Sequence, residues 1–200
     1  MPYLTKPVPN PEPVDCRILT AALDLFVARG FHSVSVHDVQ KMASVSIGSI
    51  YNHFGGKEGI AKALYDHLLI EIEQMIEQVC LEHANSKQRC DRVIELLFQY
   101  TETKRSIISY VFHLRHSEVL PQEPSIYHSK AFTMLQELID QVIIDEPGIT
   151  SNRLVVNASI FGGAIRMIQM RLEGVIDVPL NQYYDEAIVL IWNGLAHENS

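Results

Sequence analysis

Apolar residues recur at helical spacing along most of the chain. Ile18, Ala22, Leu25 and Phe26 stand at positions i, i+4, i+7 and i+8, which places them on one face of a helix over residues 15–29. The same period predicts helices over about 35–43, 47–53, 57–83, 88–102, 104–118, from after Pro124 to 144, 150–173 and 179–196. Alternating strand patterns are absent from the sequence. The prediction is therefore an all-α fold of about nine helices.

Start and stop signals flank the short helices near the amino terminus. Ser35 and Asp38 have the S-x-x-D spacing of a helix-capping box with a short acidic arm. Ser46 is placed to cap the next helix. Gly30 and Gly55 stand where the first and third helices are expected to end.

The amino-terminal segment has a different composition. Five of the nine prolines stand there: Pro2, Pro7, Pro9, Pro11 and Pro13. Proline lacks the N–H that a helix interior requires, so we expect residues 1–14 to form an extended arm. The segment has no apolar run of signal-peptide length, and no run of 18 apolar residues predicts a membrane span. With three cysteines in no disulfide or zinc pattern, we expect a cytoplasmic protein without membrane partners.

The three short helices over residues 15–53 fit a helix-turn-helix unit. In such a unit the last helix enters the major groove of DNA, and its exposed side must be small and polar to allow close approach. Ser46, Gly48, Ser49 and Asn52 meet that requirement, while Ile50 faces inward. Helical periodicity alone also fits many other three-helix bundles.

The residue string is more specific than the periodicity. ILTAALDLFVARGFHSVSVHDVQKMASVSIGSIYNHFGGKEGI, residues 18–60, resembles the DNA-binding domain of the tetracycline-repressor (TetR) family. The resemblance implies a transcription regulator, expected to act as a repressor, that binds a palindromic operator as a homodimer and is released by a small-molecule effector. It also implies three parts: an arm over 1–14, a DNA-binding domain over 15–60, and an effector-binding and dimerisation domain over 61–200.

The resemblance assigns DNA-facing roles to nine residues: Ser35, Ser46, Ile47, Gly48, Ser49, Tyr51, Asn52, His53 and Lys57. The resemblance places Ser35, Tyr51, His53 and Lys57 on the phosphate side. The base-side candidates are Ser46, Ile47, Ser49 and Asn52, and Gly48 allows close approach. The chemistry agrees, because tyrosine and lysine donate to phosphate oxygens and asparagine bridges two adenine atoms. Other interpretations stay open: Tyr51 as a cover for the helical bundle, His53 as a structural residue, and Ser46 as a helix cap alone.

Two positions depart from the family pattern. Ser44 stands in the turn where the family usually has glycine, and a left-handed non-glycine residue costs about 1 kcal/mol. Gly56 stands where the family often has serine, which removes a capping hydroxyl before Lys57. Neither departure changes the assignment.

The resemblance also implies an effector pocket in the carboxy-terminal part. Methionine and aromatic side chains suit apolar ligands. The candidates are Tyr100, Tyr110, Phe112, His113, His116, Phe132, Arg166, Met167 and Met170. The alternative is that the aromatic residues are core and that Arg166 reaches solvent.

Dimerisation is assigned to the two most apolar helices, over 150–173 and 179–196. The candidate interface residues are Phe161, Gly162, Ile165, Ile188, Ile191 and Trp192. We expect close packing to explain the Gly162-Gly163 pair, because two glycines weaken a helix. The alternative is that these faces are buried within one subunit. A dimer would set two recognition helices about 34 Å apart, as a palindromic operator requires.

No pattern for catalysis, metal or cofactor binding is found. His113 and His116 have helical spacing but no third ligand is evident, so we expect neither metal nor cofactor. Cys80 and Cys90 form either a redox pair or two small buried side chains. An enzyme is thus the weakest alternative, and a regulator controlled by a protein partner is the nearer one.

The net charge of −8 is unevenly distributed. Residues 1–60 hold five basic and five acidic residues, while residues 61–200 hold 11 basic and 19 acidic ones. The acidity argues against a protein that coats phosphates, but it leaves a neutral DNA-binding domain as the face that docks. We expect few charged phosphate contacts and a shallow salt dependence of DNA binding.

Overall fold

The computed structural model describes residues 2–113, 120, 128–149 and 152–196, and these residues form helices without a strand. The predicted all-α class is confirmed. If α9 (Arg153–Asn157), η3 (Ala158–Gly162) and α10 (Gly163–Leu172) are counted as one continuous helix, the described residues form nine α-helices. None of the described helices is long and apolar enough to cross a membrane.

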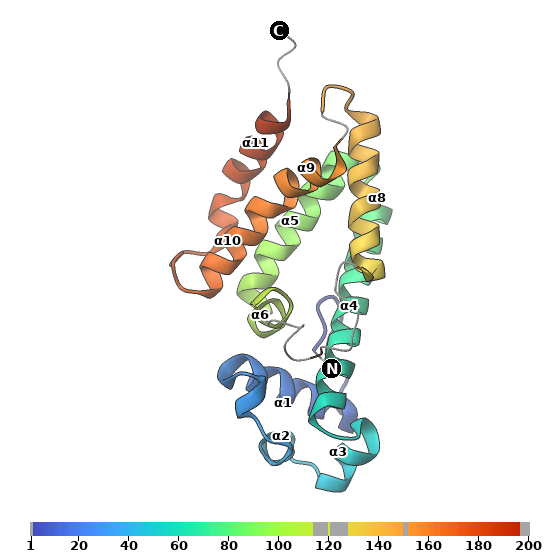
Figure 1. Cartoon of the computed structure of the whole chain (residues 1–200), viewed down its shortest axis with the longest axis vertical. Helices are drawn as coiled ribbons and strands as arrows, with labels where there is room; N and C mark the ends of the chain where they lie inside the picture. The colour runs from blue at the N-terminus through green and yellow to red at the C-terminus, as the bar shows by residue number, and fades with distance from the viewer. Residues whose placement is uncertain (1, 114–119, 121–127, 150–151, 197–200) are drawn as a thin grey trace. The chain divides into compact units, whose positions relative to one another are not determined.

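The chain divides into two compact units (Figure 1). The first unit comprises residues 1–72 and 106–126, and the second comprises residues 73–105 and 127–200. Helix α4 (Lys57–Glu82) contributes its first part to one unit and its last part to the other. This grouping rests on contacts, so the functional division at residue 60 stays a prediction.

The first unit is built around α1 (Val14–Arg29). It also contains η1 (Phe31–Ser33), α2 (Val36–Ala43), α3 (Ile47–Phe54), the beginning of α4, and α6 (Arg105–His113) from its second residue. All four residues of the apolar face predicted for α1, Ile18, Ala22, Leu25 and Phe26, are buried. They share the core of the unit with Ile50 of α3, Ile60 and Leu64 of α4 and Tyr110 of α6.

The predicted caps and turn are present. Ser35 and Asp38 form a complete capping box at α2, and the Ser46 side chain accepts a hydrogen bond from the Ser49 N–H at α3. Gly30 ends α1 with a φ of 77°. Ser44 has the left-handed conformation, with φ 53° and ψ 50°, that the departure from glycine required.

The connection from α3 to α4 is short and tight. Gly55 and Gly56 have positive φ angles of 72° and 141°. One turn later, a Cβ atom on Gly59 would lie 1.7 Å from the Phe54 carbonyl oxygen. The backbone of α4 therefore reaches the end of α3 only because residue 59 has no side chain. Sequence reasoning identified the Gly55-Gly56 stop but not this contact.

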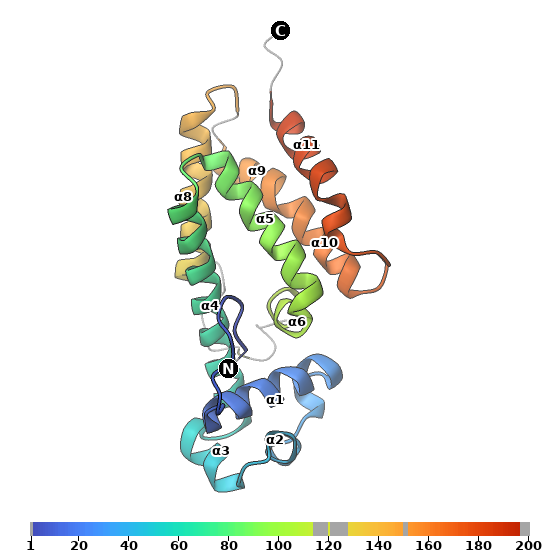
Figure 2. The ribbon, with the colours of Figure 1, turned by 180° about the vertical axis from the view of Figure 1, so that it is seen from behind.

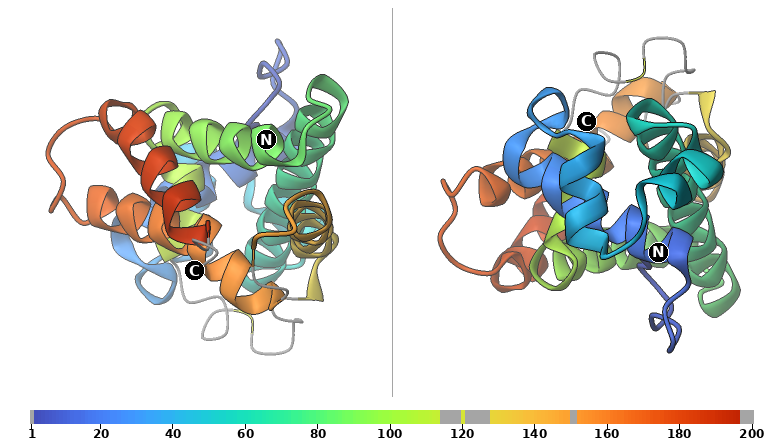
Figure 3. Two further views of the ribbon diagram at one scale, coloured as in Figure 1. Left: turned by 90° about the horizontal axis from the view of Figure 1, so that it is seen from above. Right: turned by 90° about the horizontal axis from the view of Figure 1, so that it is seen from below.

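The second unit is a bundle of helices (Figures 1 and 2). It contains the end of α4, α5 (Ser86–Thr103), α8 (Lys130–Asp145), α9 (Arg153–Asn157), the π turn η3 (Ala158–Gly162), α10 (Gly163–Leu172), η4 (Leu180–Tyr183) and α11 (Tyr184–Leu195). The view from above shows α10 and α11 next to α5 (Figure 3, left).

Side-chain bonds link the helices of this second unit. Arg171 of α10 donates from Nε and Nη2 to the Glu102 carboxylate of α5, at 2.9 and 2.8 Å. Trp192 of α11 donates from Nε1 to Asp91 of α5 at 2.7 Å. Lys130 of α8 bonds Glu77 of α4 at 3.1 Å. Each partner lies on a different helix, so these contacts fix the order of packing.

Two predicted helices differ from those observed. The helix predicted over 150–173 is interrupted by η3, where the helical turn is wider. A Cβ atom on Gly162 or Gly163 would meet nothing within 4 Å in the described chain, so close packing of these glycines against a second copy stays a prediction. The helix predicted over 104–118 is described only to His113, and its remainder lies outside the described residues.

Replacing Gly59 with alanine is expected to destabilise the first unit. The new Cβ would overlap the Phe54 carbonyl, and relieving such an overlap costs about 1–3 kcal/mol. Gly194→Ala is the matched control, because the space beside Gly194 of α11 is open and alanine favours a helix by up to about 1 kcal/mol. Thermal unfolding followed by circular dichroism measures both. Equal stability of the Gly59→Ala variant and the wild type would contradict the tight junction.

Candidate nucleic-acid interface

Helix α3 presents a polar, protruding face. Gly48, Tyr51, Asn52 and His53 are exposed, and the Tyr51 side chain keeps 54% of its surface accessible. Ile47 and Ser49 are half-buried. Because Ile50 is fully buried on the opposite side, it holds the helix against its own unit and directs the polar side chains outward. The view from below faces α2 and α3 (Figure 3, right).

Ser46 caps α3 and also contacts Ser49. Its Oγ accepts the Ser49 N–H at 3.1 Å and lies 2.8 Å from the Ser49 Oγ. The capping interpretation is therefore observed. The two hydroxyls also form a pair, which fixes both side chains at the amino-terminal end of the helix. That end carries a partial positive charge from the helix dipole.

Ser35 is engaged by Asp38. The Ser35 N–H donates to the Asp38 carboxylate at 2.9 Å, and its hydroxyl donates to the same oxygen. These hydrogen bonds hold the pKa of Asp38 below its usual range. A phosphate at Ser35 would have to share these donors with a carboxylate that is already charged. The Ser35 donors at the start of α2 are thus already bound by a carboxylate of the same protein.

Lys57 is held by η1. Its Nζ donates to the Phe31 carbonyl at 3.1 Å and lies 4.3 Å from the centroid of the Phe31 ring. Cation–π contact and hydrogen bond together position the ammonium group. Lys57 therefore ties the start of α4 to the connection between α1 and α2, a role that sequence reasoning did not find. The ammonium keeps further N–H donors, so its predicted phosphate contact is compatible with this position.

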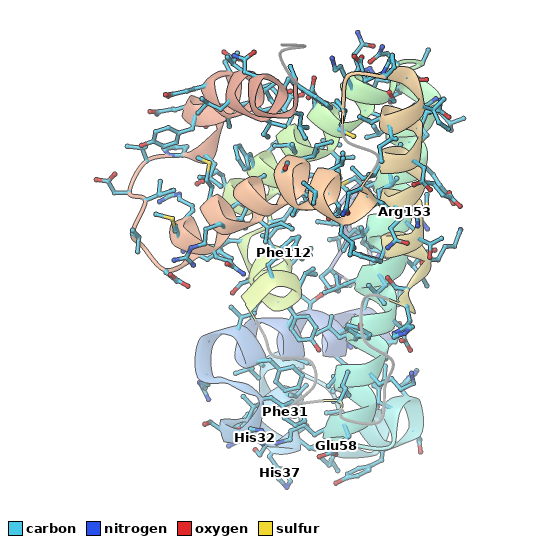
Figure 4. All side chains as sticks on the ribbon, turned by 45° about the horizontal axis from the view of Figure 1, so that its top comes forward. Phe31, His32, His37, Glu58, Phe112 and Arg153 are labelled. Atoms are coloured by element: carbon cyan, nitrogen blue, oxygen red, sulfur yellow. The ribbon has the colours of Figure 1, made fainter. Side chains whose placement is uncertain are left out.

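Other cations of the first unit are few. Arg29 lies 3.9 Å from Asp38; the Arg29 side chain is exposed and that of Asp38 is half-buried. Lys41 is exposed on α2, and His32 and His37 project from the ribbon (Figure 4). The surface around α2 and α3 is thus polar and near neutral rather than strongly basic.

Comparison with known proteins agrees with this geometry. The family profile described as bacterial regulatory proteins, tetR family, matches residues 18–64. HTH-type transcriptional repressor Rv3405c of Mycobacterium tuberculosis is 35% identical over 65 residues, which are 32% of this chain and 35% of that protein. Over residues 18–64 the chain is therefore similar to the tetR family. It aligns with about a third of the length of the curated relatives that it matches first.

Solved structures of tetR-like regulators share the fold over nearly the whole chain. The fatty acid degradation regulator FadR of Bacillus halodurans has a TM-score of 0.72 at 19% identity, covering 93% of this chain and 98% of that one. FadR of Bacillus subtilis, solved in complex with stearoyl-CoA, has a TM-score of 0.71 at 21% identity, covering 89% and 97%. At such identities the likeness concerns the fold alone. The family profile and the curated relatives are described as bacterial regulatory proteins and transcriptional regulators.

The predicted effector residues fall in both units. Tyr110 is fully buried in the first unit and its hydroxyl donates to the Ala61 carbonyl of α4 at 3.2 Å. Phe112 is half-buried on the same helix (Figure 4). Tyr100, Phe132, Met167 and Met170 are half-buried in the second unit. The His113 side chain and all of His116 lie outside the described residues, so a pocket lined by this set stays a prediction.

Arg166 is exposed and lies 3.8 Å from Glu173. This agrees with the alternative interpretation, in which the Arg166 side chain reaches solvent. Because Glu173 is on the same helical segment, the pair balances its own charge at the surface.

The predicted dimer residues also differ in burial. Phe161 is buried inside its own unit, while Gly162 is exposed. Ile165, Ile188, Ile191 and Trp192 are half-buried. Next to them on α11, Val189 and Leu190 are exposed apolar side chains. The periodicity predicted an apolar stripe but not which side of it would be covered.

The cysteines are free thiols. Cys90 is buried, and burial raises the pKa of its thiol to about 12. Burial also raises the pKa of Cys80. Because the thiolate is the reactive form, these environments favour the interpretation as packed side chains over a redox pair. Among the described residues no group of three or more His, Cys, Asp or Glu could hold a metal ion.

Proposed function

We propose that the chain is a DNA-binding transcriptional regulator, most simply a repressor, that reads a palindromic operator through α3. The observation that carries the proposal is that the family match over residues 18–64 contains the exposed polar face of α3. In this proposal Asn52, Ser49 and Ser46 approach base edges, and Gly48 allows the backbone to come close. Tyr51 and His53 donate to phosphate oxygens.

The charge distribution supports a reader with few ionic contacts. Lys57 is engaged with Phe31 and Arg29 is near Asp38, so both of these cations already have protein partners. Non-specific attraction to phosphate is then weak, and base contacts carry a larger share of the affinity. The domain over 15–60 is the proposed reader, and the domain over 61–200 the proposed regulatory part.

Asn52→Ala is expected to weaken binding to the operator about 10- to 100-fold, because a bidentate base contact contributes about 1–3 kcal/mol. The probe is DNA flanking the gene, or a duplex that the wild type selects from a random pool, in fluorescence anisotropy at several salt concentrations. Asn181→Ala, exposed in η4, is the control. Absence of sequence-specific binding by the wild type would refute the proposal. A steep dependence of affinity on salt concentration would refute the expectation that few charged residues contact phosphate.

A homodimer is the proposed assembly, through α10 and α11. Val189 and Leu190 of α11 are exposed by 56% and 64%, and Gly162 and Gly163 face open space. Exposed apolar side chains on α11, and open glycines on η3 and α10, suit close approach by a second copy of the same helices. We keep Gly162, Ile165, Ile188, Ile191 and Trp192 in this interface. Phe161 is buried in its own protomer, so it would support the interface helices from inside and not contact the second copy.

Charges on α11 are expected to separate the dimer. A double variant, Val189→Glu with Leu190→Glu, would place two carboxylates in a desolvated interface and shift the protein to monomers. Leu81→Glu is the control, because Leu81 of α4 is 83% exposed and lies outside α10 and α11. Sedimentation velocity measures the state. A monomeric wild type, or a double variant that stays dimeric, would contradict this interface.

A small-molecule effector is the proposed signal, and α4 the element that transmits it. This helix belongs to the first unit up to residue 72 and to the second from residue 73. A ligand shifts such a helix only as far as it prefers one state over another. FadR of Bacillus subtilis was solved with stearoyl-CoA, which makes a long-chain acyl-CoA the first ligand to try. The alternative is control by a protein partner.

Stearoyl-CoA is expected to raise the unfolding temperature and to lower operator affinity. At a ligand concentration 100 times the dissociation constant, binding stabilises the folded state by about 2.7 kcal/mol, or several degrees for a chain of this size. Coenzyme A alone is the control, since it lacks the acyl chain. Failure of this ligand and of a broad compound library to stabilise the protein would favour the protein partner.

A further inference from the structure

The amino-terminal arm is anchored to α4 at four consecutive residues. The Leu4 N–H donates to Glu71 Oε2 at 2.8 Å, and the Thr5 N–H approaches the same oxygen at 3.4 Å. One turn earlier, His67 Nε2 lies 3.1 Å from the Pro2 carbonyl, which can only accept, so the imidazole donates. The Tyr3 ring packs edge-on against His67 with centroids 5.5 Å apart. We call these contacts of residues 2–5 with His67 and Glu71 the arm latch.

Glu71 makes the arm latch more than a surface contact. Its side chain is 1% exposed, and Leu4 is 4% exposed. A carboxylate removed from water requires hydrogen-bond donors, and here the backbone of the arm supplies them. If the arm left, this group would lose the donors that Leu4 and Thr5 provide. The sequence predicted an extended arm, and the structure adds that its first residues belong to the core of the first unit.

The other end of the arm is fixed to α1. The Pro13 carbonyl accepts the Arg17 N–H at 3.0 Å, and Glu12 Oε1 accepts the Thr20 hydroxyl at 3.2 Å. Burial, followed by interaction with Cys16 of α1, raises the pKa of Tyr3. The arm thus contacts α1 through Glu12 and Pro13, and it contacts α4 through residues 2–5. It limits how far these two helices can move relative to each other.

The position of α4 in turn determines that of α3. The two helices are joined by two residues, and Gly59 of α4 is packed against the Phe54 carbonyl of α3. His67 and Glu71 lie on the last turns of α4 that belong to the first unit. A constraint on these turns is therefore transmitted along a continuous helix to the start of α4 and to the recognition helix.

We propose that the arm latch positions α3 for sequence-specific DNA binding by fixing α4 against α1, with Glu71 as the positioning residue. The inference rests on the proposed function, because it assumes that α3 reads DNA. It assigns the arm a role in the geometry of the reader, without contact between the arm and the bases.

Three proteins test the arm latch: the full chain with Glu71→Met, a chain in which Lys6 follows Met1, and the combination of both changes. Methionine keeps the unbranched shape of glutamate but does not offer a carboxylate oxygen. Asp66→Asn is the matched control, because it removes the same charge from α4 at an exposed position, where Asp66 pairs with Lys62 at 3.2 Å.

The first readout needs no DNA. Hydrogen–deuterium exchange of the amides over residues 64–72 is expected to be faster in the Glu71→Met and shortened proteins than in the wild type and Asp66→Asn. The second readout is affinity for the duplex that the wild type selects from a random pool, against an unrelated duplex of the same length. Each change is expected to lower affinity for the selected duplex about tenfold and to leave the unrelated duplex within about twofold.

Combining the two changes decides between positioning and general destabilisation. If both act through one contact, Glu71→Met adds less than about twofold in the shortened chain. Additive losses, unchanged affinity for the selected duplex, or equal loss for both duplexes would each overturn the arm latch. If the wild type selects no duplex, the proposed function itself fails and the inference with it. Selection by the wild type and equal binding by every variant refutes the latch alone.

Discussion

The contact between Gly59 and the Phe54 carbonyl is the constraint on which the first unit depends. A Cβ atom at residue 59 would lie 1.7 Å from that oxygen, so α3 and α4 can meet this closely only through a glycine. The left-handed Gly55 and the extended positive-φ Gly56 turn the chain back within two residues. Since α3 cannot rotate independently of α4, every contact that fixes α4 also fixes the exposed face of α3.

Several contacts converge on α4 within this unit. Lys57 donates a hydrogen bond to the Phe31 carbonyl of η1. The Ala61 carbonyl accepts one from the Tyr110 hydroxyl, and Glu71 accepts one from the Leu4 N–H. They are spaced along the helix and join it to the α1–α2 connection, to α6 and to the arm. Each of the three joins a side chain to a backbone group. Such contacts depend on the course of the chain more than on the identity of the partner side chain, and short sequence motifs do not reveal them.

Local signals explain how much could be predicted from the sequence. The apolar face of α1, the Ser35–Asp38 capping box and the left-handed Ser44 follow from interactions within a few residues, and each is present. Contacts between distant segments were missed. Nothing in the spacing of Glu71 predicts that its carboxylate meets Leu4, 67 positions earlier. The candidate DNA face could be predicted because it lies on one short helix. The effector and dimer sets draw on separate helices, and hydrophobic periodicity does not specify how those helices pack.

The π turn at Ala158–Gly162 has a consequence for how the helix around it is interpreted. A π turn accommodates one residue more than an α-helical turn, and one residue corresponds to about 100° of rotation about the helix axis. A single helical wheel drawn from Arg153 to Leu172 therefore carries a phase step in its middle. Side chains before and after the step that fall on one face of that helical wheel therefore point in different directions in the structure.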